Sequence, residues 1–245
     1  MAVSIEYVGR LTERILAKEI KKQEKNFKYS AAIALTKTAK IAQKNVIAEL
    51  PKVFDRPTPW TLRGTFVLPA KPTKIETKVA FKDDRAIPTL GQKGGTAAAN
   101  YIKWQVEGGT RQQKGIERKL VALGILEKDE AVVPGDAVRL NRYGNMTRAT
   151  LSKIIAQVAA GKGQGISEGF GQATTKTGRK RYFYDPNIRP RAIYERYGRG
   201  GKRIRPVLYF IKLPKYKKRL PFNDIVTKTF DRELDDEFDR QFNFR

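Results

Sequence analysis

The stretch that decides the fold is FNDIVTKTFDRELDDEFDRQFNFR, residues 222–245, at the end of the printed sequence. An apolar side chain recurs there at every fourth position, in the series Phe222, Val226, Phe230, Leu234, Phe238 and Phe242. Since four residues overshoot one helical turn of 3.6 residues by about 40°, the series forms a slowly winding ridge on a helix. The pattern predicts a long amphipathic helix whose ridge packs on another surface.

The charges of this stretch differ in sign from those of the remaining chain. Residues 222–245 hold seven acidic and four basic side chains, a net charge of −3, whereas the whole chain has +25, so residues 1–221 carry +28. We interpret residues 1–221 as a basic body and residues 222–245 as an acidic docking element, with the six ridge residues as an oligomer interface. The alternative is that the ridge packs within its own domain, as amphipathic helices usually do.

Composition narrows the classes of function. The 245 residues include no Cys and no His, which removes disulfides, thiolate and imidazole catalysis and the commonest zinc ligands. The hydrophobic content of 40% suffices for a folded core, and the excess of basic residues indicates nucleic acid or acidic protein neighbours. No segment approaches the about 20 apolar residues of a membrane helix. We expect a soluble protein made in the cytoplasm, with no membrane partner.

The rest of the chain reads as an α+β fold, in which an Ala-rich helix over residues 30–49 packs on a small antiparallel or mixed sheet. Val3, Ile5 and Tyr7 alternate with polar residues and suggest a short edge strand before a helix at 11–25. Further helices are predicted over residues 97–106, 116–123 and 148–160, the last capped by Thr147. Strands are predicted over residues 62–68, 73–82, 132–135, 182–184, 192–197 and 207–213.

Two glycine-rich basic segments predict contacts with a partner. Residues 161–181 contain six glycines and read as an extended loop or arm, and residues 198–203 form a second basic loop. The basic residues that we assign to nucleic-acid or acidic-partner contacts are Lys176, Arg179, Lys180, Arg181, Arg199, Lys202 and Arg203. Neighbouring aromatic residues such as Tyr194 and Tyr197 would add base stacking. The alternative is that these tyrosines are half-buried strand residues with arginine on the outer face.

No catalytic, cofactor or metal-binding residues are predicted. The glycine clusters match neither phosphate-binding pattern, and the carboxylates that might bind Mg²⁺ are scattered over loops. These carboxylates are Asp83, Asp84, Glu107, Asp129, Asp136 and Asp185. The E-x-K spacing of some nucleases occurs at Glu19, Glu76 and Glu117, where we favour solvated charge pairs. We expect that the protein is not an enzyme.

The order of these parts resembles the tail-completion and neck proteins of tailed bacteriophages, similar to the lambda minor tail protein Z group. The resemblance rests on the small-residue helix at 31–46, the hairpin at 62–81 and the segment VEGGT at 106–110. It extends to PVLYFIKLP at 206–214, followed by LPF at 220–222 and the last helix. This chain is longer than typical members, chiefly over residues 116–181.

The resemblance implies a structural virion protein that forms a ring at the junction of head and tail. Its partners would be its own copies, other tail or connector proteins, and DNA through nonspecific contact. Ring closure would pair the acidic helix of one copy with the basic body of the next. The alternative function is a sequence-independent nucleic-acid-binding protein that acts outside a particle.

Overall fold

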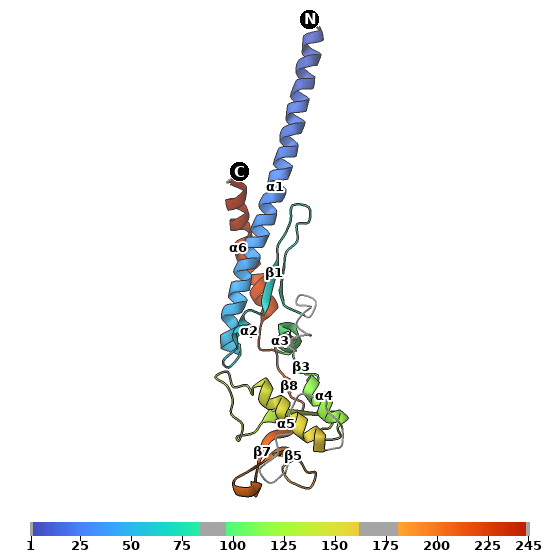
Figure 1. The fold of residues 1–245 in the computed structure, drawn as a ribbon. Helices are drawn as coiled ribbons and strands as arrows, with labels where there is room; N and C mark the ends of the chain where they lie inside the picture. Colours follow the sequence, from blue (N-terminus) through green and yellow to red (C-terminus); the bar gives the residue numbers. More distant parts are fainter. Residues whose placement is uncertain (1, 84–96, 162–180, 244–245) are drawn as a thin grey trace. The chain divides into compact units, whose positions relative to one another are not determined.

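The computed structural model describes residues 2–83, 97–161 and 181–243, with only the backbone for residues 2–17, 161 and 243. Helices combine with small antiparallel sheets, which confirms the predicted α+β class (Figure 1). The chain forms two compact units: Met1–Val106 with Lys218–Arg245 is unit 1, and Glu107–Lys217 is unit 2. This division differs from the expected body at 1–221, because the last helix belongs to the same unit as the first 106 residues.

Helix α1 (Ala2–Val53) spans 52 residues and includes the predicted Ala-rich helix. The edge strand expected around Val3, Ile5 and Tyr7 is wrong, because α1 is helical from Ala2 onward. Helix growth is cooperative, so a short alternating pattern and one glycine, which costs about 1 kcal/mol in a helix, do not stop it. The helix ends just after Pro51, which lies in its last turn.

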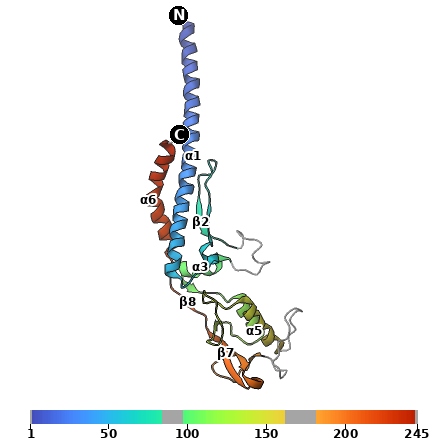
Figure 2. The same cartoon turned by 60° about the vertical axis from the view of Figure 1, so that its left-hand side comes forward.

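Helix α6 (Phe222–Asn243) confirms the predicted last helix and lies alongside α1 in both views (Figures 1 and 2). The two helices are antiparallel, because Asn45 contacts Thr229 while Ser30, earlier in α1, contacts Gln241 near the end of α6. With 22 residues against 52, and about 1.5 Å of rise per residue, α6 covers less than half of α1. The first half of α1 therefore extends beyond the end of α6.

The remainder of unit 1 packs along α1, from its last turns to residues 21–29, which line a pocket together with Pro72, Thr73 and Ile75. The short helix α2 (Pro59–Leu62) leads to the antiparallel hairpin of β1 (Thr65–Leu68) and β2 (Lys78–Phe81), and α3 (Ala98–Val106) follows. A small apolar core joins α1, α3 and the segment just before α6, through Leu50, Val53, Ala98, Ile102 and Leu220. The sequence predicted both the hairpin and the third helix, but not their common core with α6.

Unit 2 is built on an antiparallel sheet with the strand order β4-β7-β6-β5. Its strands are β4 (Glu130–Pro134), β5 (Tyr182–Tyr184), β6 (Ala192–Tyr197) and β7 (Arg203–Lys212). Two helices, α4 (Gly115–Ala122) and α5 (Arg148–Gly161), complete the core, and the short strands β3 (Gly109–Thr110) and β8 (Lys215–Tyr216) pair separately. The predicted cap is confirmed, since the Thr147 hydroxyl accepts a hydrogen bond from the Thr150 N–H.

The strand register assigns side chains to the two faces of the unit 2 sheet. Tyr182, Ile193 and Leu208 face the helices and join Ile154 and Leu120 in the core. Because successive strand residues alternate in direction, Phe183, Tyr194 and Tyr209 lie on the opposite face. The hairpin of β6 and β7, closed by a short 3-10 turn at Arg199–Gly201, carries the sheet's basic end.

Candidate assembly and nucleic-acid surfaces

The seam between α1 and α6 is made of small and polar side chains. On α1, Ser30 and Ala34 are fully buried, and Asn45 donates a hydrogen bond of 3.0 Å to the Thr229 hydroxyl. Glu237 of α6 is buried and forms an ion pair of 2.9 Å with Lys37, whose side chain stays 49% exposed. Small residues let two helices approach closely, and polar pairs fix which residues meet.

The apolar ridge of α6 lies along the edge of this seam. Phe222 packs against Phe81, with ring centroids 5.1 Å apart, and Phe27 of α1 contacts Phe238 at 5.3 Å and Phe242 at 6.3 Å. Val226, Phe230 and Leu234 between them are half-buried. The ridge thus contacts its own chain at both ends, as in the own-domain alternative, and its part in an oligomer interface stays a prediction.

The ridge becomes more exposed toward the end of α6, because its four-residue spacing rotates it by about 40° at each step. Phe222 joins the small core at the start of α6, whereas Phe242, five steps of about 40° later, is 38% exposed. Phe27, beside it on α1, is 50% exposed. An aromatic cluster of Phe27, Phe238 and Phe242 therefore lies half in water where α6 ends.

The face of α6 that points away from α1 carries an acidic stripe. Asp224, Asp231, Asp235 and Asp239 are exposed, and spacings of seven, four and four residues place them on one side of the helix. Among the described residues, none of the four carboxylates has a Lys or Arg nitrogen within 4.0 Å. Glu237, by contrast, is paired inside the seam. The stripe is predominantly acidic, and the exposed Lys228 and Arg232 lie among its four carboxylates on the same helix face.

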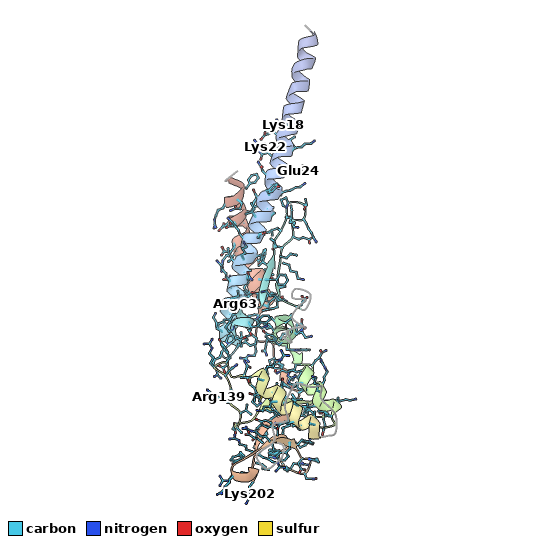
Figure 3. The ribbon with its side chains drawn as sticks, viewed as in Figure 1. Lys18, Lys22, Glu24, Arg63, Arg139 and Lys202 are labelled. Atoms are coloured by element: carbon cyan, nitrogen blue, oxygen red, sulfur yellow. The ribbon has the colours of Figure 1, made fainter. Side chains whose placement is uncertain are left out.

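The α1 segment of residues 18–28 is basic, and it reaches from beyond the end of α6 to Phe27, which contacts Phe238 and Phe242. Lys18, Lys21, Lys22 and Lys25 are exposed, and Lys18 and Lys22 project from the part of α1 beyond α6 (Figure 3). Residues 18–28 hold five lysines and two glutamates, a net charge of +3. Ile20 is 60% exposed on the same segment. We call residues 18–28 the basic extension.

In unit 2, the hairpin of β6 and β7 brings three of the predicted contact residues together. Arg199, Lys202 and Arg203 are all exposed, and Lys202 lies at the hairpin tip (Figure 3). Among the described residues, none of the three has a carboxylate within 4.0 Å. We call these three residues the hairpin tip cluster. Lys176, Arg179 and Lys180, predicted for the same role, lie outside the described residues.

Arg181, the remaining predicted contact residue, has a partner inside unit 2. The Glu195 carboxylate is buried between β5 and β7, where it forms ion pairs with Arg181 and, at 2.7 Å, with Arg205. This pairing neutralises part of the charge of both guanidinium groups. Arg181 was predicted to contact a partner molecule as part of the basic cluster at 179–181. It is instead paired with the buried Glu195 of its own chain.

Arginines beside the hairpin stack on aromatic rings. The Arg196 guanidinium lies 4.0 Å from the centroid of the Phe183 ring, and that of Arg205 lies 4.9 Å from the Tyr197 ring. Tyr194 is buried on the sheet face away from the helices, and its hydroxyl donates to the carbonyl of Pro190. The alternating basic and aromatic residues of the sequence thus become cation–π pairs.

A buried ion pair that the sequence did not predict holds the first part of unit 2. Arg111 binds Glu117 through two hydrogen bonds of 2.7 and 2.6 Å, and the side chains are 9% and 0% exposed. Burial raises the pKa of Glu117, but hydrogen bonds from Arg111 and from the N–H groups of Lys114 and Val132 together bring that pKa below its usual value. The only available signal was the glutamate at the third residue of α4, a position that favours capping.

Among the described residues, the carboxylates considered for catalysis do not converge, and Asp84 lies outside these residues. Glu76 is exposed and pairs with Lys74, Glu19 is exposed beside Lys22, and Glu117 is the buried partner of Arg111. The solvated reading therefore fits Glu19 and Glu76, and it is wrong for Glu117. Over residues 18–83, 97–160 and 181–242, no three acidic side chains gather as a metal site would require.

Comparison of the chain with protein-family models, with characterised proteins and with solved structures gives no match. No helix among the described residues is long and apolar enough to cross a membrane. The surfaces above therefore carry the functional argument by their own geometry and charge.

Proposed function

We propose that this chain is a structural virion protein of a tailed bacteriophage, which forms part of the head–tail junction or tail-completion ring. It acts through contacts with its own copies and with neighbouring tail or connector proteins, after synthesis in the cytoplasm of the bacterial host. The order of sequence elements supplies the phage context. The observation that carries the assembly role is that unit 1 leaves two complementary surfaces uncovered, the basic extension of α1 and the acidic stripe of α6.

A second copy of the chain is the occupant that fits both surfaces. The basic extension carries +3, and the acidic stripe presents four carboxylates that lack a cation partner among the described residues. The two surfaces lie on different parts of one unit, so each copy can bind one neighbour with its extension and another with its stripe. Such a head-to-tail contact is heterologous and generates a ring, or a filament where the rotation does not close.

Charge alone does not hold such an assembly together. Exposed ion pairs contribute about 0.2–1 kcal/mol each and weaken with salt, so their main effect is to select and orient the partner. Apolar contact has to supply the rest. Ile20 on the extension and the half-exposed cluster of Phe27, Phe238 and Phe242 provide apolar surface beside the charges.

The direct test is mass spectrometry of purified phage particles from a strain that encodes this chain. We expect the chain to be present at a fixed copy number per particle, in the range of a ring rather than a trace. Sedimentation of the purified protein should show an oligomer that dissociates as salt rises. Absence from the particles, together with a monomer at high concentration, would contradict the proposal.

A second candidate function is sequence-independent nucleic-acid binding outside a particle. The hairpin tip cluster favours it, since its three cations have no carboxylate partner among the described residues. Salt dependence of binding would not separate the two candidates, because both use basic surfaces. The particle analysis does so, since only the virion role requires the chain at stoichiometric amounts.

A further inference from the structure

We propose that the hairpin of β6 and β7 binds the phosphate backbone of duplex DNA through the hairpin tip cluster, without reading sequence. The inference rests on the second candidate function and deepens it, because it names duplex DNA as the ligand and uses none of the surfaces of unit 1. Arg199, Lys202 and Arg203 make the contacts, and Arg196 on the adjacent strand extends them along the hairpin.

The charge distribution of unit 2 concentrates free cations at this hairpin. Residues 107–217 contain 24 basic and 9 acidic side chains, a net charge of +15. Within strands β5, β6 and β7 the single acidic residue is Glu195, which is buried and already shared by Arg181 and Arg205. The tip therefore keeps its full positive charge, and a polyanion can neutralise it.

The neighbouring rings favour phosphate contacts over base stacking. Phe183 and Tyr197 are each covered on one face by a guanidinium group, so their best stacking partner is already in place. A guanidinium group over a ring still has N–H donors from which phosphate oxygens can accept hydrogen bonds. One face of each ring is thereby occupied by a cation, and Tyr197 remains 37% exposed.

Duplex DNA fits the hairpin better than an acidic protein does. β6 and β7 are the central strands of the four-stranded sheet, so it is their connecting turn at Arg199–Gly201 that would meet the phosphates flanking the major groove, which is about 12 Å wide. Duplex DNA also presents one charge per about 1.7 Å of axis, a density that scattered Asp and Glu side chains do not reach. The phosphate contacts proposed for Arg199, Lys202 and Arg203 fix the position of the protein on the duplex and carry no sequence information.

The test is a fluorescence-anisotropy titration of the full chain with a labelled duplex of about 30 base pairs, repeated over a range of salt concentrations. The triple variant Arg199→Gln, Lys202→Gln, Arg203→Gln should bind at least about tenfold more weakly at low salt. Its slope of log K against log salt should be shallower by about 2.7, since each lost phosphate contact removes about 0.9. The matched control is Lys40→Gln, Lys44→Gln, Lys78→Gln, which removes the same charge from exposed positions in unit 1 and should leave the slope unchanged.

A second variant and two competition experiments distinguish the remaining explanations. If circular dichroism shows that the triple variant is misfolded, the loop variant Arg199→Gln, Lys202→Gln replaces it, with an expected slope change of about 1.8. An equal loss in the control, or wild-type binding by the hairpin variant, would overturn the inference. So would displacement of the duplex by polyglutamate of equal charge at equal concentration, which indicates an acidic protein site, or tighter binding of a single strand of the same length. A hairpin variant that loses DNA binding yet still enters particles supports this inference and leaves the virion role intact.

Discussion

Among the described residues, unit 2 buries two glutamates and unit 1 buries one, and Glu117 of unit 2 is neutralised differently from Glu237 of unit 1. In unit 2, Glu117 is paired with Arg111, which is itself buried, and two backbone N–H groups complete its hydrogen bonds. In unit 1, Glu237 sits in the seam between α1 and α6, but its partners Lys37 and Arg240 remain about half exposed. The Arg111–Glu117 pair is thus closed away from water, whereas Glu237 of unit 1, like Glu195 of unit 2, has cation partners that reach water.

The exposure of the paired cations indicates which ion pair can separate at low free-energy cost. Separating a pair that is buried on both sides leaves a charge without solvent, so the Arg111–Glu117 pair of unit 2 locks one arrangement. The cations of the seam can return to water when the contact opens, so that seam separates at lower cost. We infer that unit 2 is the fixed body, and that unit 1, with its exposed aromatics and unpaired charges, is the part that adapts to neighbouring copies.

The largest effect is expected from breaking the locked pair. Arg111→Met should lower the free energy of unfolding of unit 2 by about 3–5 kcal/mol, because Glu117 stays buried without its cation. Urea denaturation measures the change, and Arg118→Met, at an exposed position of α4 next to Glu117, should cost less than about 1 kcal/mol. Similar losses for the two variants would show that the pair does not lock the unit.

A smaller effect, with a pH signature, is expected from the glutamate itself. Its folded pKa lies below its unfolded value, so its charge stabilises unit 2 above the unfolded pKa, and that stability is lost as pH falls through the folded pKa. Glu117→Gln should cost about 2 kcal/mol at pH 7, where charged hydrogen bonds are replaced by neutral ones. In denaturation curves from pH 7 to pH 2.5, the gap between wild type and variant should close at acid pH. A constant gap would contradict the assignment.

The seam should respond more weakly to loss of its aromatic contact. Phe238→Ala removes a half-buried ring that contacts Phe27 and Phe242, and it should cost about 1–2 kcal/mol, less than the about 3–5 of a fully buried ring. Thermal unfolding followed by circular dichroism measures it. Phe242→Ala, at the more exposed end, serves as the comparison and should cost less. A loss of unfolding free energy above about 3 kcal/mol for Phe238→Ala would show that this ring is as fully buried as a core ring.

The smallest effect is expected at the exposed partner of the seam glutamate. Lys37→Met should lower the unfolding free energy of unit 1 by about 1 kcal/mol or less, since Glu237 retains Arg240 and the edge of the seam admits water. The loss should shrink further in 0.5 M salt. Urea denaturation at two salt concentrations checks this, and a salt-independent loss of the size found for Arg111→Met would remove the contrast between the units.

Local sequence patterns predicted most elements of the fold. The spacing of Ala39, Ala42 and Val46 predicted a helix, and Thr147 predicted the cap of another. The glycines at 198–201 indicated a loop between two strands, which the structure shows as a hairpin. Each of these features depends on residues that are close in sequence. The first ten residues were mispredicted, since a short alternating pattern carries less weight than a long helix that continues into it.

Long-range pairing could not be predicted from one sequence. The ridge of α6 indicated that a surface exists for it, but nothing in its spacing identifies α1, whose Asn45 is 184 residues away from Thr229. The buried pairs of Glu117 and Glu195 were missed for the same reason, because charge counts do not tell which arginine meets which carboxylate. For the hairpin tip cluster, composition indicated the cations, and the structure adds that three of them lie together.

The central claim is that the basic extension of one copy binds the acidic stripe of another, and charge reversal tests it most directly. One variant carries Lys21→Glu, Lys22→Glu and Lys25→Glu, and the other carries Asp231→Lys, Asp235→Lys and Asp239→Lys. Analytical ultracentrifugation at low salt should show an oligomer for the wild type and a shift toward monomer for each variant alone. The control Lys40→Glu, Lys44→Glu should remain oligomeric. Mixing the two variants should give mixed complexes that contain both chains, because the reversed extension of one variant again faces a stripe of opposite charge. If both variants stay oligomeric alone, or if the mixture remains monomeric, these surfaces do not bind each other and the assembly account is wrong.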